Sequence, residues 1–317
     1  MKYVIYSAIH NKKLVTETLY SMLTLFHKMK GDFKVIIYTN YADSFYKEFE
    51  KNNFEFLSKI IVEEISKSTV NDWVYNGYPY TIKIKVIEHF FNKYKANALF
   101  IDSDFYIKND ITPLYDMIEN KEFVMYKYAR PVYLTALLGI EDIGTFYTFL
   151  KHPNYAVKRH HIHYFSGVLG INYKYKNVLD DVYALCCQFY KITRNHSSEE
   201  IAFSYVFQNI GKINVAKSFF TGYGSQQFKR IFIGYTFNTF FENDKRYLEE
   251  LLALFNLKVD FLNELNFTYD DLKYLLNIFY KHVNADFENI KNIDQNRYDE
   301  YMAKYNDALK NQLSNTP

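Results

Sequence analysis

An apolar run ends in two acidic residues within the stretch Ala98-Leu99-Phe100-Ile101-Asp102-Ser103-Asp104. The apolar run predicts a buried strand, and Asp102 and Asp104 then lie at its carboxyl end. Positions i and i+2 of an extended chain point the same way, so both carboxylates face one side. Hard anionic oxygens suit Mn²⁺ or Mg²⁺, with other coordination positions left for phosphate oxygens. We therefore predict a metal site here; the alternative is a polar strand end followed by an ordinary turn.

Strand and helix patterns alternate along the first part of the chain. Strands are predicted at residues 3–7, 34–39, 59–65, 98–101, 123–128 and 168–171. Helices are predicted at residues 14–30, 44–49 with Ser44 as cap, 81–95, 178–189 and 198–208 with Ser197 and Ser198 as candidate caps. Such alternation predicts an α/β fold with a mostly parallel sheet covered by helices on both faces. Ligands of such sheets bind beyond the carboxyl ends of the strands, where Asp102 and Asp104 lie.

The chain is predicted to have two parts, a main domain at residues 1–240 and a helical appendage at residues 241–317. The appendage carries two apolar stripes, Leu248-Leu251-Leu252-Phe255 and Leu272-Leu275-Leu276-Phe279. These stripes favour packing or a homo-oligomer formed through the C-terminal helices. The net charge of +2 divides into −5 on the appendage and +7 on the remainder. A basic main domain suits an anionic ligand such as a nucleotide diphosphate, whereas the weak, scattered charge argues against nucleic acid.

Cysteine content and hydropathy indicate the cellular compartment. Cys186 and Cys187 are adjacent and no others exist, so no disulfide framework is expected. The start of the chain reads as a strand and not as a signal peptide, and no apolar run approaches the ~18 residues of a membrane span. The acidic appendage argues against a polybasic anchor. We expect a cytoplasmic protein with at most peripheral contact at the inner face of the membrane.

Aromatic residues are abundant, with 32 Tyr and 29 Phe in 317 residues. An AT-rich genome, whose codons favour these residues, is one explanation. Another is that some tyrosines, such as Tyr6, Tyr38 and Tyr78, line a sugar or nucleobase cleft, where a flat amphipathic ring is useful. Core packing explains these three equally well.

Four short segments around the Asp-Ser-Asp stretch resemble segments of glycosyltransferases of the GT-A fold. The similarity covers roughly residues 1–230. The segments are most similar to the retaining group that contains glycogenin and the bacterial lipopolysaccharide galactosyltransferases. The matches are Val4-Ile5-Tyr6-Ser7-Ala8, Lys85, Ser166-Gly167-Val168-Leu169 and Glu199-Glu200-Ile201-Ala202-Phe203. In that family these elements cradle the nucleobase, contact the donor, border the donor sugar and lie near the reacting carbon.

The resemblance implies a metal-dependent, hexosyltransferase-like glycosyltransferase that moves a sugar from a nucleotide-diphosphate donor, a UDP-sugar first, to a saccharide or glycolipid acceptor in polysaccharide biosynthesis. It implies a donor-binding set made of Ser7, Ala8, Lys85, Ser103, Ser166 and Gly167. It also implies a catalytic carboxylate at Glu200 or Glu199. Such a group deprotonates the acceptor hydroxyl, stabilises positive charge or acts as nucleophile. Neighbouring positions diverge on a helix, so one of the two should face the cleft, and Glu200 is preferred. The alternative is that both are dipole partners of a helix N-terminus.

Some residues depart from the family pattern. Phe165 stands where the family has an asparagine, and Phe219 in Phe219-Phe220-Thr221-Gly222 replaces the histidine that is its third metal ligand. Within Arg159-His160-His161-Ile162-His163, His163 is the candidate replacement ligand. A solvated basic loop is the favoured interpretation of that cluster. Lys83 is likewise interpreted as a solvated lysine, because Lys83 and Lys85 cannot share one face of a helix.

Three other classes of protein remain as alternatives. A haloacid-dehalogenase-type phosphatase also exposes Asp-x-Asp after an apolar strand, but its motif requires Thr or Val at the position that Tyr106 occupies here. A nucleotidyltransferase wants glycines after the first strand, and residues 7–13 contain none. A non-catalytic carbohydrate-binding or scaffold protein derived from a transferase is the third. The sequence does not define the donor, the acceptor or the stereochemistry of transfer.

Overall fold

The computed structural model describes residues 1–51, 56–131 and 161–222, all within the first compact unit of the chain, Met1–Gly222. Its strands are β1 (Lys2–Ala8), β2 (Phe33–Thr39), β3 (Ile60–Glu64), β4 (Ala98–Ile101), β5 (Phe105–Ile107), β6 (Phe123–Pro131), β7 (Ile162–Ile171), β8 (Ile213–Val215) and β9 (Phe220–Gly222). Its helices are α1 (Lys13–Lys28), α2 (Ala42–Lys51), α3 (Lys67–Trp73), α4 (Thr81–Tyr94), α5 (Thr112–Glu119), α8 (Val178–Thr193) and α9 (Ser198–Ile210), with short 3-10 turns η1 (Leu57–Lys59) and η2 (Tyr173–Tyr175). The boundary predicted at residue 240, the two predicted C-terminal stripes, Arg159 and His160 lie outside the described residues.

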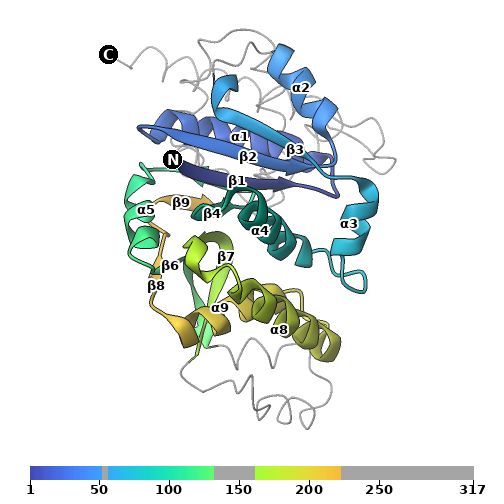
Figure 1. The fold of residues 1–317 in the computed structure, drawn as a ribbon, viewed down its shortest axis with the longest axis vertical. Coiled ribbons are helices and arrows are strands. Elements are labelled where there is room, and N and C mark those ends of the chain that lie inside the picture. Colours follow the sequence, from blue (N-terminus) through green and yellow to red (C-terminus); the bar gives the residue numbers. More distant parts are fainter. Residues whose placement is uncertain (52–55, 132–160, 223–317) are drawn as a thin grey trace, which may run out of the picture. The chain divides into compact units, whose positions relative to one another are not determined.

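The main sheet has seven strands in the order β3-β2-β1-β4-β7-β6-β8 (Figure 1). The pairs β2–β3, β1–β2 and β1–β4 are parallel, as is β6–β8. β7 runs antiparallel to both β4 and β6. A second, two-stranded sheet pairs β5 with β9 antiparallel. The mostly parallel α/β sheet predicted from the sequence is therefore confirmed, with β7, between β4 and β6, as the antiparallel strand.

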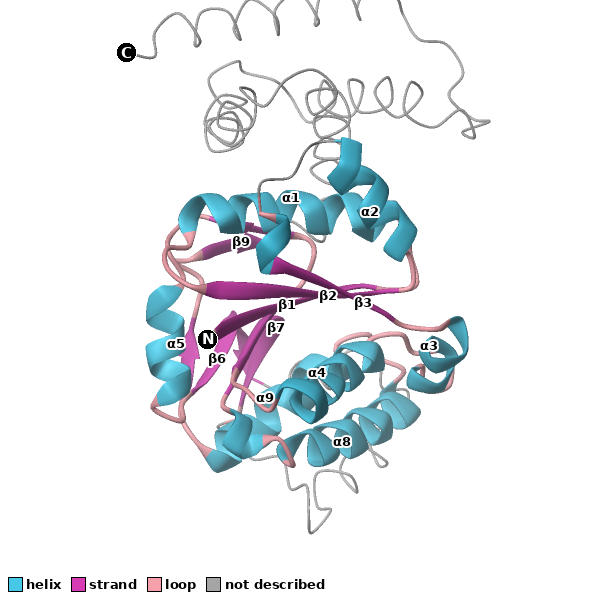
Figure 2. Ribbon diagram, turned by 45° about the horizontal axis from the view of Figure 1, so that its top comes forward, coloured by secondary structure: helices cyan, strands magenta, loops and turns pink. Residues whose placement is uncertain are grey.

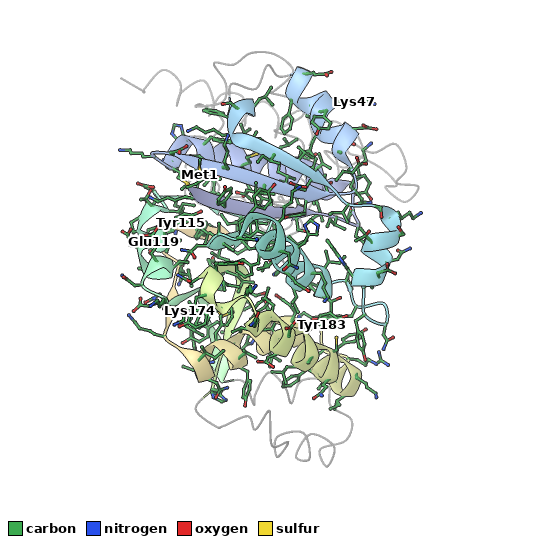
Figure 3. All side chains as sticks on the ribbon, in the orientation of Figure 1. Met1, Lys47, Tyr115, Glu119, Lys174 and Tyr183 are labelled. Carbon is green, nitrogen blue, oxygen red and sulfur yellow. The ribbon has the colours of Figure 1, made fainter. Side chains whose placement is uncertain are left out.

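Helices cover both faces of the main sheet. In Figure 2, α1 and α2 lie on one face, and α4 and α8 lie on the other. This coverage explains why Val4, Ile5 and Tyr6 in β1 are all fully buried, since a parallel strand covered on both faces has no solvent side. Side chains fill the layers between the strands and the helices (Figure 3). Each fully buried aliphatic or aromatic side chain stabilises the fold by about 1.5–3 kcal/mol.

Helix α4 is buried over much of its length and packs between the sheet and α8. Its buried residues are Thr81, Ile82, Lys83, Ile84, Val86, Ile87, Phe90 and Phe91. A lysine in that set is unexpected, because buried lysines normally require a partner. The partner lies at the end of β4 and is described below.

Two predicted helix caps are wrong. Ser44 lies inside α2, because the helix begins at Ala42. Just before this start, the backbone N–H of Tyr41 donates to Thr39 Oγ1 at 2.9 Å. At the start of α9, neither Ser197 nor Ser198 provides a side-chain cap. The backbone N–H of Glu199 instead binds the hydroxyl of Tyr78 at 3.1 Å, so a distant residue satisfies this helix end.

Cys186 and Cys187 are free and buried. Among the described helices, none has the length and apolar character that crossing a membrane requires.

Candidate functional site

The two aspartates lie where β4 ends, as predicted. The Asp102 backbone N–H donates to the Gly167 carbonyl at 2.8 Å, which continues the pairing of β4 with β7 by one residue. Asp102 and Asp104 are partly exposed, whereas Ser103 between them is buried. The Ser103 hydroxyl lies 3.4 Å from Glu17 Oε2 on α1. The turn therefore presents its carboxylates and turns its serine inward.

Gly167 is required by the close approach of Phe105. A Cβ atom built at Gly167 would lie 2.3 Å from Phe105 Cε2 and 3.3 Å from Asp102 Oδ2. A Cβ at Gly222 in β9 would lie 2.8 Å from Phe105 Cζ. The ring that follows Asp104 is thus wedged between two glycines, which fixes where the Asp-Ser-Asp turn stands.

Lys83 forms the centre of a buried polar cluster. Its Nζ lies 3.0 Å from Asp102 Oδ2, 3.0 Å from Ser166 Oγ, 3.2 Å from the Ser166 carbonyl and 3.5 Å from Glu199 Oε1. The Ser166 hydroxyl donates to Glu199 Oε2 at 2.9 Å. These four residues come from α4, the end of β4, β7 and α9. We refer to Lys83, Asp102, Ser166 and Glu199 as the Lys83 cluster.

The interpretation of Lys83 as a solvated lysine is therefore wrong. Lys83 is 8% exposed, and it lies one and two turns before Ile87 and Phe90 on the buried stripe of α4. That i, i+4, i+7 spacing with apolar residues is the sequence signal that identifies it. Lys85 lies on another face, where its Nζ binds Glu88 Oε2 at 2.8 Å and lies 4.2 Å from the centre of the Tyr183 ring on α8, labelled in Figure 3.

The electrostatics of the cluster reflect an excess of carboxylates. Desolvation, opposed by the Lys83 ammonium and reinforced by the carboxylates of Asp104 and Glu199, raises the pKa of Asp102 to about 7. Desolvation, again opposed by Lys83, raises the pKa of Glu199. For Lys83, desolvation would lower the pKa, but Asp102 and Glu199 outweigh it and raise the pKa. Carboxylates outnumber the Lys83 ammonium, so each added negative charge is disfavoured.

Asp102 and Asp104 have the donor chemistry of a divalent-cation site. Mg²⁺ is usually held by one or two carboxylates together with phosphate oxygens of a substrate. The excess of negative charge around Asp102 also favours a cation there. Across residues 1–51, 56–131 and 161–222, no group of three or more His, Cys, Asp or Glu side chains could hold a metal ion. The aspartate pair therefore fits such an ion only with further ligands.

His163 does not supply the missing ligand in this structure. Its Nε2 lies 3.0 Å from Glu200 Oε2, and it belongs to no metal-binding group with Asp102 and Asp104. The favoured interpretation of the histidine cluster as a solvated loop is also wrong for His161 and His163, which are both 2% exposed. The rings of His161 and Tyr205 make an edge-to-face contact, with 4.7 Å between their centres.

Glu199 and Glu200 face different partners, as two adjacent residues on a helix must. Glu199 joins the Lys83 cluster and its side chain is 1% exposed, whereas that of Glu200 is 21% exposed and is held by His163. Neither is merely a dipole partner of the helix start. No local pattern in the sequence indicates these contacts, because they join α9 to β7 and α4.

The first strand brings Ser7 and Ala8 to the same edge as the aspartates. Ile5 pairs with Phe100 in the parallel β1–β4 ladder, so two residues further on Ser7 lies level with Asp102. Ser7 is partly exposed, while Ala8 is buried and its carbonyl accepts from Thr39 Oγ1 at 2.7 Å. Ser7 and Ala8 therefore lie at the carboxyl end of β1, on the strand next to β4.

The three tyrosines named from the sequence lie in the core. Tyr6 and Tyr38 are fully buried, and Tyr78 is 2% exposed. The Tyr78 hydroxyl donates to the His196 carbonyl at 2.7 Å. Core packing is therefore the explanation for these side chains.

Phe219 is far along the β5–β9 pair from the aspartates. Its carbonyl accepts from the backbone N–H of Lys108, and the ladder then runs to Gly222 opposite Phe105. The end of β9 nearest Asp104 is Gly222, three residues later in the chain. Phe219 matches a metal-ligand position in sequence, but the strand pairing places it away from the aspartates.

No protein-family model and no curated protein matches this sequence. Among the solved structures that match are several glycosyltransferases. Mouse xyloside xylosyltransferase 1 is 14% identical, with a TM-score of 0.46 over 68% of this chain and 84% of that chain. The galactosyltransferase LgtC, solved with donor and acceptor sugar analogues, is 11% identical, with a TM-score of 0.46 over 67% and 72%. The bifunctional glycosyltransferase WbbM is 11% identical, with a TM-score of 0.43 over 67% and 38%. At these scores the likeness carries no argument about the donor, the acceptor or a metal.

Proposed function

We propose that this chain is a glycosyltransferase that moves a sugar from a nucleotide-diphosphate donor, a UDP-sugar first, to a saccharide or glycolipid acceptor. The observation that carries the proposal is the Lys83 cluster with Asp104 beside it, at the carboxyl end of β4. Ligands of α/β sheets bind beyond this edge. The cluster orders one carboxylate of the Asp-Ser-Asp turn through a buried ammonium, which a turn without a function would not require.

Asp102 and Asp104 would hold Mn²⁺ or Mg²⁺. When bound, the ion would stabilise the negative charge that grows on the departing nucleotide diphosphate. Lys83 Nζ binds Asp102 Oδ2 at 3.0 Å, so the other carboxylate oxygen of Asp102 would bind the ion. Lys83 thereby fixes the orientation of Asp102 and partly neutralises it.

Other residues would position the donor. Ser7 and Ala8 end β1 level with Asp102, where a nucleobase could lie against the strand end. Ser166 and Gly167 border the aspartates, and the absence of a Cβ at Gly167 makes room for the Phe105 ring beside the Asp-Ser-Asp turn. Lys85 is bound to Glu88 on another face of α4, so Lys83, and not Lys85, would lie on the donor side of the site.

Glu200 is the carboxylate best placed to take part in the reaction. Sugar transfer breaks the bond from the anomeric carbon to the diphosphate oxygen and forms one to the acceptor oxygen, which loses its proton. A carboxylate beside that carbon serves the proton or the positive charge that develops. Glu199 cannot do so without leaving Lys83 and Ser166, whereas Glu200 is partly exposed.

Donor turnover tests the proposal. The protein is incubated with a panel of nucleotide-diphosphate sugars, with Mn²⁺ or with chelator, and the released nucleotide diphosphate is quantified. We expect release with at least one donor in Mn²⁺, and its loss in chelator and in Asp104→Asn. Asp43→Asn on the exposed start of α2 is the matched control and should retain release. Equal release in chelator, or no release with any donor, would contradict the proposal.

A further inference from the structure

His163 and Glu200 form a pair beside the Lys83 cluster. His163 Nε2 lies 3.0 Å from Glu200 Oε2, with 3% of the histidine side chain exposed and 21% of the glutamate side chain. When the Glu200 carboxylate is ionised it can only accept, so Nε2 is then the donor of this hydrogen bond. Bonds of this kind to a charged acceptor are about twice as strong as neutral ones. The pair thus joins a buried donor to a carboxylate that reaches the surface.

Helix α9 holds both members of the pair in register. Gln208 Oε1 accepts from the Ile162 backbone N–H at 2.9 Å, and Gln208 Nε2 donates to the Ile162 carbonyl at 2.7 Å. Ser204 Oγ accepts from the Tyr164 backbone N–H at 2.9 Å. The strand residues on both sides of His163 are therefore fastened to α9.

Glu200, Ser204 and Gln208 recur every four residues along α9, so they share one face of that helix. All three bind the start of β7, and His163 is the residue of that strand which meets Glu200. The Glu200 carboxylate also remains within electrostatic reach of the Lys83 cluster. It contributes, after Asp102 and Glu199, to the causes that raise the pKa of Lys83 against desolvation. The polar face of α9 therefore holds Glu200 in a fixed position beside the Lys83 cluster.

We infer that His163 is a positioning residue that holds the Glu200 carboxylate in one orientation for sugar transfer. The inference rests on the proposed function. The imidazole engages one carboxylate oxygen and leaves the other for the anomeric carbon or the acceptor hydroxyl. Removing the imidazole would release Glu200 to other rotamers, and a misplacement of about 1 Å can cost on the order of 100-fold in rate.

The test is a double-mutant cycle read in steady-state kinetics. His163→Leu should lower kcat by about 10- to 100-fold while the KM for the donor stays within about 2-fold, since the diphosphate contacts remain. His163→Gln keeps an amide donor that can reach Glu200, so it should recover most of the kcat. In a Glu200→Gln background, His163→Leu should change kcat by less than about 2-fold, because the two residues act as a unit.

His161→Leu is the matched control, since His161 is equally buried two residues away and packs on Tyr205. It should leave kcat unchanged, and thermal unfolding of each variant shows whether it is folded. If His163→Leu does not fold, the His163→Gln variant still decides: a kcat as low as that of Glu200→Gln would contradict positioning by a donated hydrogen bond.

The outcomes separate this inference from the proposed function. Parental kcat in His163→Leu, or an equal loss in both backgrounds, would overturn the positioning role alone when the parental protein is active and Glu200→Gln is impaired. Absence of turnover by the parental protein with any donor would remove the proposed function and this inference together.

Discussion

Glu199 and Glu200 are adjacent on α9, yet they belong to different regions. Glu199 lies in a buried one, here the closed region, and Glu200 lies with His163 in a partly exposed one, here the open region. Glu199 is 1% exposed and lies 3.5 Å from Lys83 Nζ, whereas Glu200 is 21% exposed and lies against His163. The closed region, the Lys83 cluster, fastens α4, β4, β7 and α9 together. The open region leaves a carboxylate oxygen for a ligand. Burial therefore separates a group that builds the site from a group that can act in it.

Removing the ammonium from the closed region should have the largest effect on stability. Lys83→Met leaves the Asp102 and Glu199 carboxylates without their counter-charge, which we expect to lower the free energy of unfolding by about 3 kcal/mol or more. Lys85→Met is the matched control on the same helix, and loss of its partly exposed pair with Glu88 should cost less than about 1 kcal/mol. Urea unfolding at pH 7 measures both. Equal destabilisation by the two variants would show that Lys83 is not the centre of a buried cluster.

The open region should affect turnover more than stability. Glu200→Gln should lower kcat by about 100-fold or more, close to 2.7 kcal/mol of activation free energy. The affinity for the donor should barely change, because the contacts to the diphosphate remain. Glu199→Gln should lower kcat less, since its carboxylate is occupied by Lys83 and Ser166. Parental rates in both variants would place the reacting carboxylate elsewhere.

The close approach of Phe105 to β7, beside the Asp-Ser-Asp turn, can be tested at Gly167. In Gly167→Ala the new Cβ would lie 2.3 Å from Phe105 Cε2, so we expect overpacking that costs about 1–3 kcal/mol. In Gly211→Ala the nearest atom would be 3.3 Å away, and its extended backbone suits any residue, so the change should stay within about 1 kcal/mol. Thermal unfolding compares the two. A Gly167→Ala protein as stable as the parent would mean that Phe105 has room to move.

The smallest expected effect is on the pH dependence of stability. Desolvation, opposed by Lys83, raises the pKa of Glu199 above its ordinary value of 4.5. The folded protein then holds this proton more tightly than the unfolded chain does. In the absence of metal, stability should fall as pH rises from about 4.5 through the raised pKa. Glu199→Gln removes this contribution and should flatten the curve of unfolding free energy against pH. Superimposable curves for the two proteins would contradict the direction of the shift.

Local patterns predicted the part of the site that depends on one segment. The apolar run 98–101 followed by Asp102 and Asp104 was sufficient, because a strand and its end are defined by adjacent residues. The three-residue strands β5, β8 and β9 were missed, since so short a segment shows no periodicity. Phe219 matched a motif by spacing, but the pairing of β9 with β5 decides where that residue lies.

Contacts between distant segments could not be predicted in the same way. Lys83 was misassigned because a lysine on a helix is usually solvated, although its spacing to Ile87 and Phe90 places it on the buried face. The hydrogen bond of His163 to Glu200 joins residues 37 positions apart. It depends on how β7 packs against α9, which no local pattern encodes.

Binding of a nucleoside diphosphate to the aspartate pair tests the central claim most directly. Unfolding is measured with UDP in Mn²⁺ or in chelator, for the parental protein, Asp104→Asn and the control Asp43→Asn. At about 100 times its dissociation constant, the ligand should raise the free energy of unfolding by about 2.7 kcal/mol in Mn²⁺. We expect this stabilisation in the parental protein and in Asp43→Asn, and its loss in chelator and in Asp104→Asn. Equal stabilisation in chelator, or undiminished stabilisation of Asp104→Asn, would contradict a metal-bridged donor site at the end of β4.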